Sequence, residues 1–336
     1  MLFGDRDSIL GVSCGHGRLA LSLVKSGRLK KAIWVDVDES ILENSEIKSK
    51  RLFAELLKDL VREHGLSSKK AAFALPDTDV FTRTITMPKM TDEQIRLNIP
   101  YEFRDFIHGE LKEYVFDYSY MPEMTRVDES GKEIITLFIA ATPKNELAEI
   151  EDMFKAAGMK LVKAMPKVCT FEAILKLLPT EEETLKERCI IDIGQGHTRL
   201  MIYKNGHYKL VHIIDIGERQ IIQVLADEMN VDMHIARTYL ETNYENCVDL
   251  QPLVNVYKDI SLEILKGLNF YEVSDMSARL ADVTLYGGGS RIPPLVQLLK
   301  DRLSMNVVTM NEMLPEWSKG EWELNLVAGS LGLALN

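Results

Sequence analysis

The chain lacks the residue patterns that mark disulfide-bonded and zinc-binding proteins. Its 336 residues include only 4 cysteines, and no two of them are spaced as a CxxC pair. Scattered cysteines of this kind argue against a zinc site and favour a reduced, cytosolic compartment. They are Cys14, Cys169, Cys189 and Cys247.

Basic runs and long apolar runs are also missing. The net charge is -11, and no run of four or more Lys or Arg residues occurs. Because affinity for nucleic acid is carried largely by Lys and Arg, the composition argues against a nucleic-acid-binding protein. No apolar stretch approaches the ~18 residues of a membrane span, and the first ten residues do not resemble a signal peptide. We therefore expect a cytoplasmic protein without direct membrane insertion, which reaches a membrane only through a partner.

What the chain does have is the composition and length of a folded protein with more than one core. Hydrophobic residues make up 46% and charged residues 27% of the sequence, which is ordinary for a soluble globular protein. A chain of 336 residues is long enough for two or more cores.

The stretch from residue 190 to 217 is the one around which the rest is organised. Three apolar runs separated by two glycine turns predict three consecutive β-strands. In the first turn, Gly194 and Gly196 let backbone N–H groups approach a phosphate, and Asp192 could hold the accompanying metal through water. The second turn contains Asn205-Gly206, a strong hairpin pattern.

The same pattern occurs 179 residues earlier in the chain. At that offset Gly15 aligns with Gly194 and Gly17 with Gly196, so both copies predict strand, turn, strand, turn, strand. A duplication so far apart predicts two related α/β lobes rather than a solenoid, whose repeats are roughly 20 to 50 residues long. One position does not repeat, since Ser13 stands opposite Asp192.

The remaining patterns predict an inserted subdomain between the two copies. After the first β-strands, a helix over 47–64 and a strand over 71–75, the pattern changes at the alternating strand 80–87. Thr91 and Gln94 are spaced as a capping box at the start of a helix. Two strands, a helix over 145–157 and a last strand over 161–164 complete a small α/β insert, whose open edge could accept an extended peptide.

A third glycine turn follows three predicted helices in the second half of the chain. The strand 282–286 breaks into Gly287, Gly288 and Gly289, and a helix follows. Such strand-to-helix turns bring backbone against a nucleotide. The domains predicted from these patterns are a first lobe (1–79 and 166–186), an insert (80–165) and a second lobe (187–336).

Together these residues resemble the actin-like ATPase superfamily, and more closely the PilM proteins of type IV pilus assembly and their relative FtsA of cell division. The family's two phosphate motifs align with 11–19 and 191–200, and its adenosine motif with 285–295. The stretch FTRTITMPKMTDEQI is similar to the start of the family's insert. The resemblance implies a duplicated, ribonuclease H-like α/β fold with two actin-like lobes and a small inserted α/β subdomain.

The resemblance also implies a nucleotide cleft that takes ATP with Mg²⁺, the metal being held by Asp192 through water. However, the first phosphate motif of the family usually carries an aspartate where this chain has Ser13. A serine lends no charge to a metal or to an attacking water. We therefore expect impaired or absent ATP hydrolysis and no catalytic residue, and a cleft without any nucleotide is the alternative. The nucleotide-binding residues implied by the resemblance are Gly15, Gly17, Asp192, Gly194, Gly196, Thr198, Gly217, Gly287, Gly288 and Gly289.

The leading functional hypothesis is a cytoplasmic scaffold of a pilus or related secretion platform. The resemblance implies that it binds the cytoplasmic tail of a PilN-like inner-membrane protein in a groove between the first lobe and the insert. The residues expected there are Arg83, Ile85, Met87 and Ile95. An active ATPase or small-molecule kinase and an FtsA-like division tether are the alternatives, and self-association is left open.

Overall fold

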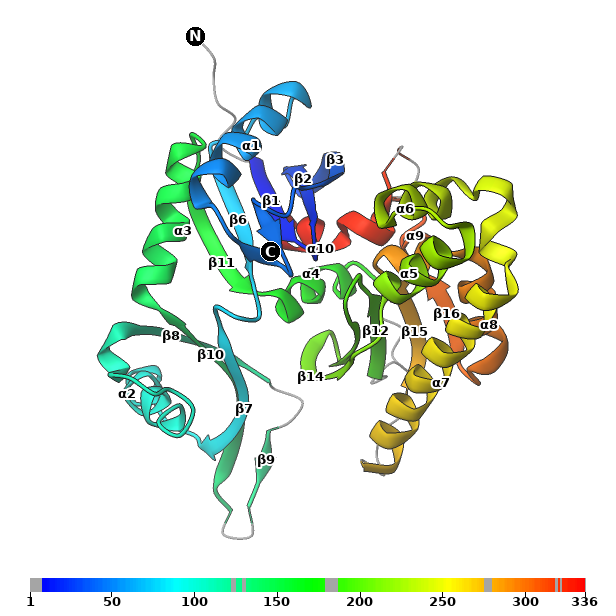
Figure 1. Ribbon diagram of the computed structural model, residues 1–336. Coiled ribbons are helices and arrows are strands. Elements are labelled where there is room, and N and C mark those ends of the chain that lie inside the picture. Colours follow the sequence, from blue (N-terminus) through cyan, green and yellow to red (C-terminus); the bar gives the residue numbers. More distant parts are fainter. Residues whose placement is uncertain are drawn as a thin grey trace. The chain divides into compact units, whose positions relative to one another are not determined.

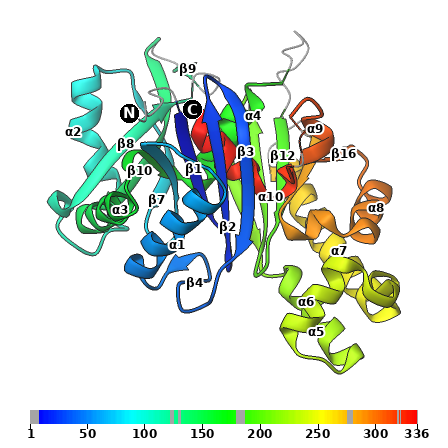
Figure 2. The ribbon, with the colours of Figure 1, turned by 90° about the horizontal axis from the view of Figure 1, so that it is seen from above.

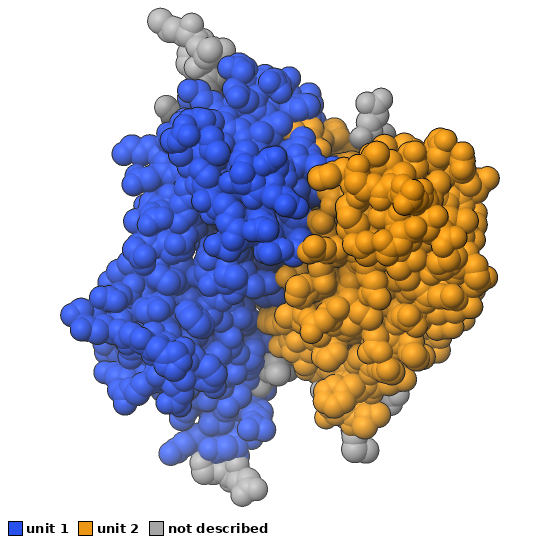
Figure 3. Space-filling model, viewed as in Figure 1, with its two compact units in different colours: residues 1–31, 35–174, 329–336 blue, residues 32–34, 175–328 orange. Residues whose placement is uncertain are grey.

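The structure is a computed structural model (Figure 1). It describes residues 8–121, 125–128, 131–178, 187–274, 280–317, 320 and 322–335. The chain divides into two compact units, coloured separately in Figure 3. Unit 1 comprises residues 1–31, 35–174 and 329–336, and unit 2 comprises residues 32–34 and 175–328.

The first sheet of unit 1 has five strands in the order β11-β6-β1-β2-β3. The helices α1 (Lys50–Glu63) and α3 (Lys144–Ala156) lie side by side against it (Figure 2). The Phe73 ring of β6 meets the Phe154 ring of α3 edge-on, with centroids 5.5 Å apart. The strands are β1 (Ser8–Cys14), β2 (Arg18–Lys25), β3 (Arg28–Asp36), β6 (Lys70–Leu75) and β11 (Lys160–Pro166).

The second sheet of unit 1 belongs to the insert and has the order β7-β10-β8. The helix α2 (Asp92–Glu102) begins at the predicted capping box, which is confirmed because Thr91 and Gln94 each bond the backbone of the other. Its buried residues pack on one face of the sheet to form the core of the insert. The strands are β7 (Phe81–Pro88), β8 (Tyr114–Tyr120) and β10 (Glu133–Pro143), and the short β9 (Arg126–Val127) pairs with β10.

The prediction that 161–164 is the last strand of the insert is wrong. That segment is part of β11, which pairs in parallel with β6 in the first sheet. The helix α3 connects β10 to β11 and also packs on α1, so it is shared with the first sheet. Parallel neighbours need a crossover connection, and α3 provides it.

Unit 2 repeats the arrangement of the first sheet. Its order is β14-β13-β12-β15-β16, which matches β3-β2-β1-β6-β11 strand for strand. Offset by 179 residues, β1 (Ser8–Cys14) falls on β12 (Glu187–Ile193). The strands are β12, β13 (Thr198–Lys204), β14 (His207–Ile214), β15 (Leu280–Tyr286) and β16 (Asn306–Thr309).

The helices of unit 2 pack on this sheet around one large apolar core. The longest, α7 (Gln251–Ser274), passes so close to the sheet at Gly267 that an added Cβ would lie 2.5 Å from Leu200 Cδ1. The others are α5 (Glu218–Met229), α6 (Met233–Thr242), α8 (Pro293–Arg302) and α9 (Met310–Met313). Shorter elements of the chain are β4 (Leu42–Glu43), β5 (Glu46–Ile47), α4 (Glu172–Leu175) and the 3-10 helices η1 (Leu111–Glu113), η3 (Lys167–Phe171), η4 (Tyr244–Asp249) and η5 (Gly288–Arg291).

The end of the last helix, α10 (Leu324–Leu335), belongs to unit 1, whereas the sequence pattern predicts that it is part of the second lobe. Two glycines allow this packing. A Cβ at Gly11 would lie 1.8 Å from Ser330 O, and a Cβ at Gly332 would lie 1.8 Å from Thr170 O. The Ser22 and Ser330 hydroxyls also share a buried hydrogen bond of 2.7 Å.

We predict that Gly332→Ala destabilises the protein, because its methyl group would overlap the Thr170 carbonyl oxygen. Overpacking of this kind costs about 1–3 kcal/mol, whereas helix propensity alone would stabilise by about 1 kcal/mol. Thermal unfolding followed by calorimetry shows whether Gly332→Ala lowers or raises the stability of the protein. Gly109→Ala is the control, since a Cβ there meets nothing within 4 Å. A Gly332→Ala variant as stable as the wild type would contradict the packing.

Candidate functional site

The second phosphate motif lies at the end of β12, where the chain turns into β13. Asp192 is 3% exposed, and the turn closes by a hydrogen bond of 3.1 Å from Gly194 N–H to His197 O. Thr198 begins β13, and its hydroxyl donates to Ile216 O at 2.8 Å. Gly196 lies within the same turn. The predicted strand, turn and strand are therefore present, and Asp192 at their start is buried.

The start of α5 closes over this turn. The Glu218 N–H donates to Gly194 O at 2.9 Å, and the Arg219 N–H donates to Gln195 O at 2.8 Å. A Cβ at Gly217 would lie 2.5 Å from Gly194 O, so only glycine permits this approach. Gly217 is therefore required for packing between two turns, whether or not a ligand is present.

The third glycine turn meets the same place. Gly287 has a φ of +86°, in the left-handed region, and its missing Cβ would lie 2.6 Å from Asp192 Oδ1. A Cβ at Gly288 would lie 2.5 Å from Glu218 Oε2, and one at Gly289 would lie 2.2 Å from Ile193 Cγ2. The segments around Gly194, Gly217 and Gly287 thus meet beside Asp192 within unit 2.

The equivalent turn of unit 1 closes by the same kind of hydrogen bond but carries different chemistry. The bond runs over 2.7 Å from Gly15 N–H to Arg18 O, equivalent to the Gly194 bond of unit 2. Gly17 has a φ of +86°, and its carbonyl accepts the Val37 N–H at 2.9 Å. Ser13 is 4% exposed and carries no charge.

The side chains that could bind a metal ion in these two turns do not suit Mg²⁺. In unit 2 the Arg199 guanidinium lies beside the predicted ligand, with its Nη1 3.9 Å from Asp192 Oδ2. Magnesium prefers oxygen ligands that bring negative charge, and a neighbouring cation opposes it. Within the described part of the chain, no three His, Cys, Asp or Glu side chains are placed to hold a metal ion.

The residues expected in the peptide groove lie elsewhere. Ile85, Met87 and Ile95 are buried in the core of the insert, between its sheet and α2. The Arg83 guanidinium lies 4.1 Å from the centre of the Phe106 ring and bonds the Glu102 carbonyl. The three residues of β7 therefore face α2, because alternate residues of a strand share one face, and Ile95 lies on α2 itself. The sequence showed two faces of β7 but not which one α2 covers.

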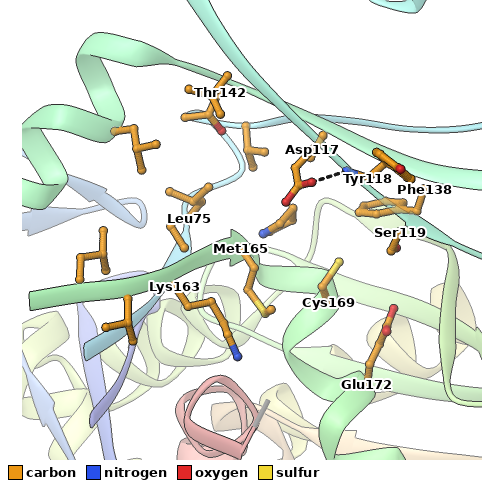
Figure 4. A pocket seen from close by; sticks show the side chains of 18 of the residues that line it. Leu75, Asp117, Tyr118, Ser119, Phe138, Thr142, Lys163, Met165, Cys169 and Glu172 are labelled. Carbon is orange, nitrogen blue, oxygen red and sulfur yellow. Dashed lines mark hydrogen bonds between the residues drawn. The ribbon is translucent and has the colours of Figure 1, made fainter. Parts of the chain in front are cut away.

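A cavity of about 560 Å³ lies within unit 1, between the insert and the first sheet. Its upper wall in Figure 4 comes from β8 and β10, on the sheet face opposite to α2, and β11 with the following helices forms the other wall. The apolar lining includes Leu75, Val115, Phe138, Ala140 and Met165. In the sequence of β8, Val115, Asp117 and Ser119 occupy alternate positions. This alternation indicates a second exposed face of the strand and is the sequence pattern that predicts the cavity wall.

Few charged groups line the cavity. Asp117 accepts the Tyr118 N–H at 2.9 Å, as drawn in Figure 4, and Glu151, Lys163 and Glu172 complete the set. Burial lowers the pKa of Lys163. Apolar walls with a small number of polar groups are typical of ligand-binding pockets.

The sequence matches the family model of type IV pilus assembly protein PilM over residues 21–316. The chain belongs to this family. No curated protein matches the sequence.

Two solved structures share the fold of this chain. A PilM-PilN type IV pilus biogenesis complex superposes with a TM-score of 0.79 at 22% identity, covering 97% of each chain. The ethanolamine utilization protein EutJ from Carboxydothermus hydrogenoformans has a TM-score of 0.57 at 15% identity, covering 97% of this chain and 88% of its own. The predicted actin-like fold is confirmed. None of the described helices is long and apolar enough to cross a membrane.

We predict that the four thiols of the folded PilM-family chain are unreactive at pH 8. Burial raises the pKa of the Cys14 thiol, at the first turn, to about 12, so about one thiol in 10⁴ is ionised at pH 8. Burial also raises the pKa values of Cys169, Cys189 and Cys247. The absorbance change with a thiol-specific disulfide reagent should be slow until denaturant is added. Rapid labelling of the folded chain would contradict this burial.

Proposed function

We propose that the chain is a cytoplasmic adaptor of a type IV pilus platform. It binds the cytoplasmic N-terminal tail of a PilN-like inner-membrane protein in the cavity of unit 1, and so is peripheral to the membrane. Three findings support the proposal: membership of the PilM family, the fold shared with a PilM-PilN complex, and the cavity itself. The cavity carries most weight, because it supplies a place for the tail.

The dimensions and lining of the cavity suit a short extended peptide. A volume of about 560 Å³ lies within the usual range for ligand pockets, roughly 300–1,000 Å³, and accommodates a few side chains. Strands form much of the walls, β8 and β10 on one side and β11, together with helices, on the other. An extended peptide that lies along strands can place alternate side chains into apolar pockets.

The turns described above support an adaptor rather than an ATPase. Ser13 supplies no charge, and Arg199 lies next to the only predicted metal ligand, Asp192. Close packing within unit 2 by itself accounts for Gly217 and for the three glycines from Gly287 to Gly289, because a Cβ at each would overlap atoms of the same unit. We infer that the nucleotide cleft of the fold is degenerate here.

We predict that a synthetic peptide of the tail of the PilN-like protein from the same organism binds the full chain in calorimetric titration. Ala140→Trp, which fills the cavity from β10, should weaken binding at least about ten-fold by steric exclusion, or about 1.4 kcal/mol. Val127→Trp, on the exposed β9, is the matched control and should bind as the wild type does. Equal binding by the two variants would place the tail outside the cavity.

We also predict that phosphate release from ATP and Mg²⁺ stays at background even at high protein concentration. Asp192→Asn should leave it unchanged, because the buried carboxylate faces Arg199 rather than a metal. A Mg²⁺-dependent rate in the wild type that falls in Asp192→Asn would show an active ATPase instead. Tail binding would be measured on the same preparations, which separates the two functions.

A further inference from the structure

The strand β7 is an edge of the insert's sheet, and the structure gives its eight residues one strand partner among the described residues, β10. Its ladder is regular over all eight pairs, from Phe81↔Ala141 to Pro88↔Ile134. A long, regular and exposed edge offers a row of backbone groups to another strand. Native proteins seldom leave such an edge open.

The direction of each backbone group of β7 follows from one hydrogen bond. The Lys89 N–H, just beyond the strand, donates to Glu133 O of β10 at 2.9 Å. In an antiparallel pair, residues alternate between those that bond the partner and those that point away. Odd-numbered residues of β7 therefore bond β10, and even-numbered ones point outward, including Pro88, which has no N–H to donate. The outward residues with both groups are Thr82, Thr84 and Thr86, all of them exposed.

The other edge strands carry features that discourage further pairing. β3 begins with basic residues at Arg28 and Lys31, β16 has only 4 residues, and the pairings of β11 and β14 contain register shifts. On β8, the Asp117 carboxylate accepts the Tyr118 N–H. Charges, bulges and short lengths are the usual protections of an edge. β7 has one charged residue, Arg83, and its guanidinium is held over Phe106.

The sequence of β7 is complementary to itself. When two copies run antiparallel about a two-fold axis at Thr84, Thr84 faces its equivalent and Thr82 faces Thr86. Threonines that face each other across strands stabilise the pair. On the other face Arg83 lies opposite Ile85, so no like charges meet. A two-fold axis requires this kind of self-complementary patch.

We propose that β7 pairs with β7 of a second copy of this chain, antiparallel about Thr84, which joins two inserts into one continuous sheet. The surface is separate from the tail cavity, so the inference does not rest on the proposed function. A contact between two strands buries less than the roughly 1,200–2,000 Å² of a stable interface. The association is therefore weak in dilute solution and is favoured where partners concentrate the chain.

Single cysteine substitutions test the register of this pairing in the full chain. Cα atoms of a hydrogen-bonded antiparallel pair are about 5.5 Å apart, which suits a disulfide. At roughly 100 µM, Thr84→Cys should form a disulfide-linked dimer at least about ten-fold more than Thr82→Cys or Thr86→Cys, whose equivalents lie about 13 Å apart. An equimolar mixture of Thr82→Cys and Thr86→Cys should cross-link again, because these positions face each other. The native thiols give little background, since burial keeps them protonated.

A second variant tests the same contact without sulfur chemistry. Thr84→Lys places two ammonium groups opposite each other, and should abolish any concentration-dependent dimer in sedimentation, while Thr84→Val should retain it. Failure of Thr84→Cys to cross-link, or cross-linking at all three positions alike, would overturn the proposal. Loss of the cross-link on addition of the tail peptide would assign the edge to the tail instead, and would also overturn pairing between copies.

Discussion

The fold depends on one backbone hydrogen bond that occurs twice. In each unit a glycine N–H after the central strand bonds the carbonyl three residues later, Gly15 to Arg18 in unit 1 and Gly194 to His197 in unit 2. This bond closes the turn after which β2 runs back beside β1 in unit 1 and β13 runs back beside β12 in unit 2. Both central strands are then buried almost throughout, with an antiparallel neighbour on one side and a parallel one on the other.

Packing within unit 2 maintains these turns without any ligand. Gly217 and Gly287 have no room for a Cβ, because backbone and side-chain atoms of the same unit already occupy that space. Asp192 is buried beside Arg199, which supplies a counter-charge inside the protein. A buried carboxylate without such a partner would be costly. Packing therefore suffices to account for Gly217, Gly287 and the buried Asp192.

The insert shows how one sheet can provide separate surfaces. Odd-numbered residues of β7 pack against α2 and bond β10, whereas its even-numbered backbone groups point outward from the edge. The face of β8 and β10 opposite to α2 lines the cavity. Because side chains alternate along a strand, one face of this sheet packs in the core and the other lines the cavity. The backbone groups at the β7 edge form a third surface.

The sequence alone determined the local elements and the duplication. The glycine turns and the capping box at Thr91 follow from short-range patterns, and the 179-residue repeat follows from comparing the sequence with itself; the structure contains each of them. Tertiary structure alone decided three further points: that β11 joins the first sheet, that Ile85 and Met87 face α2 rather than the cavity, and that Arg199 meets Asp192. Periodicity shows that a strand has two faces, but the chain that covers each face comes from distant residues. Their contact depends on packing and strand pairing over long sequence separations, which no local pattern records.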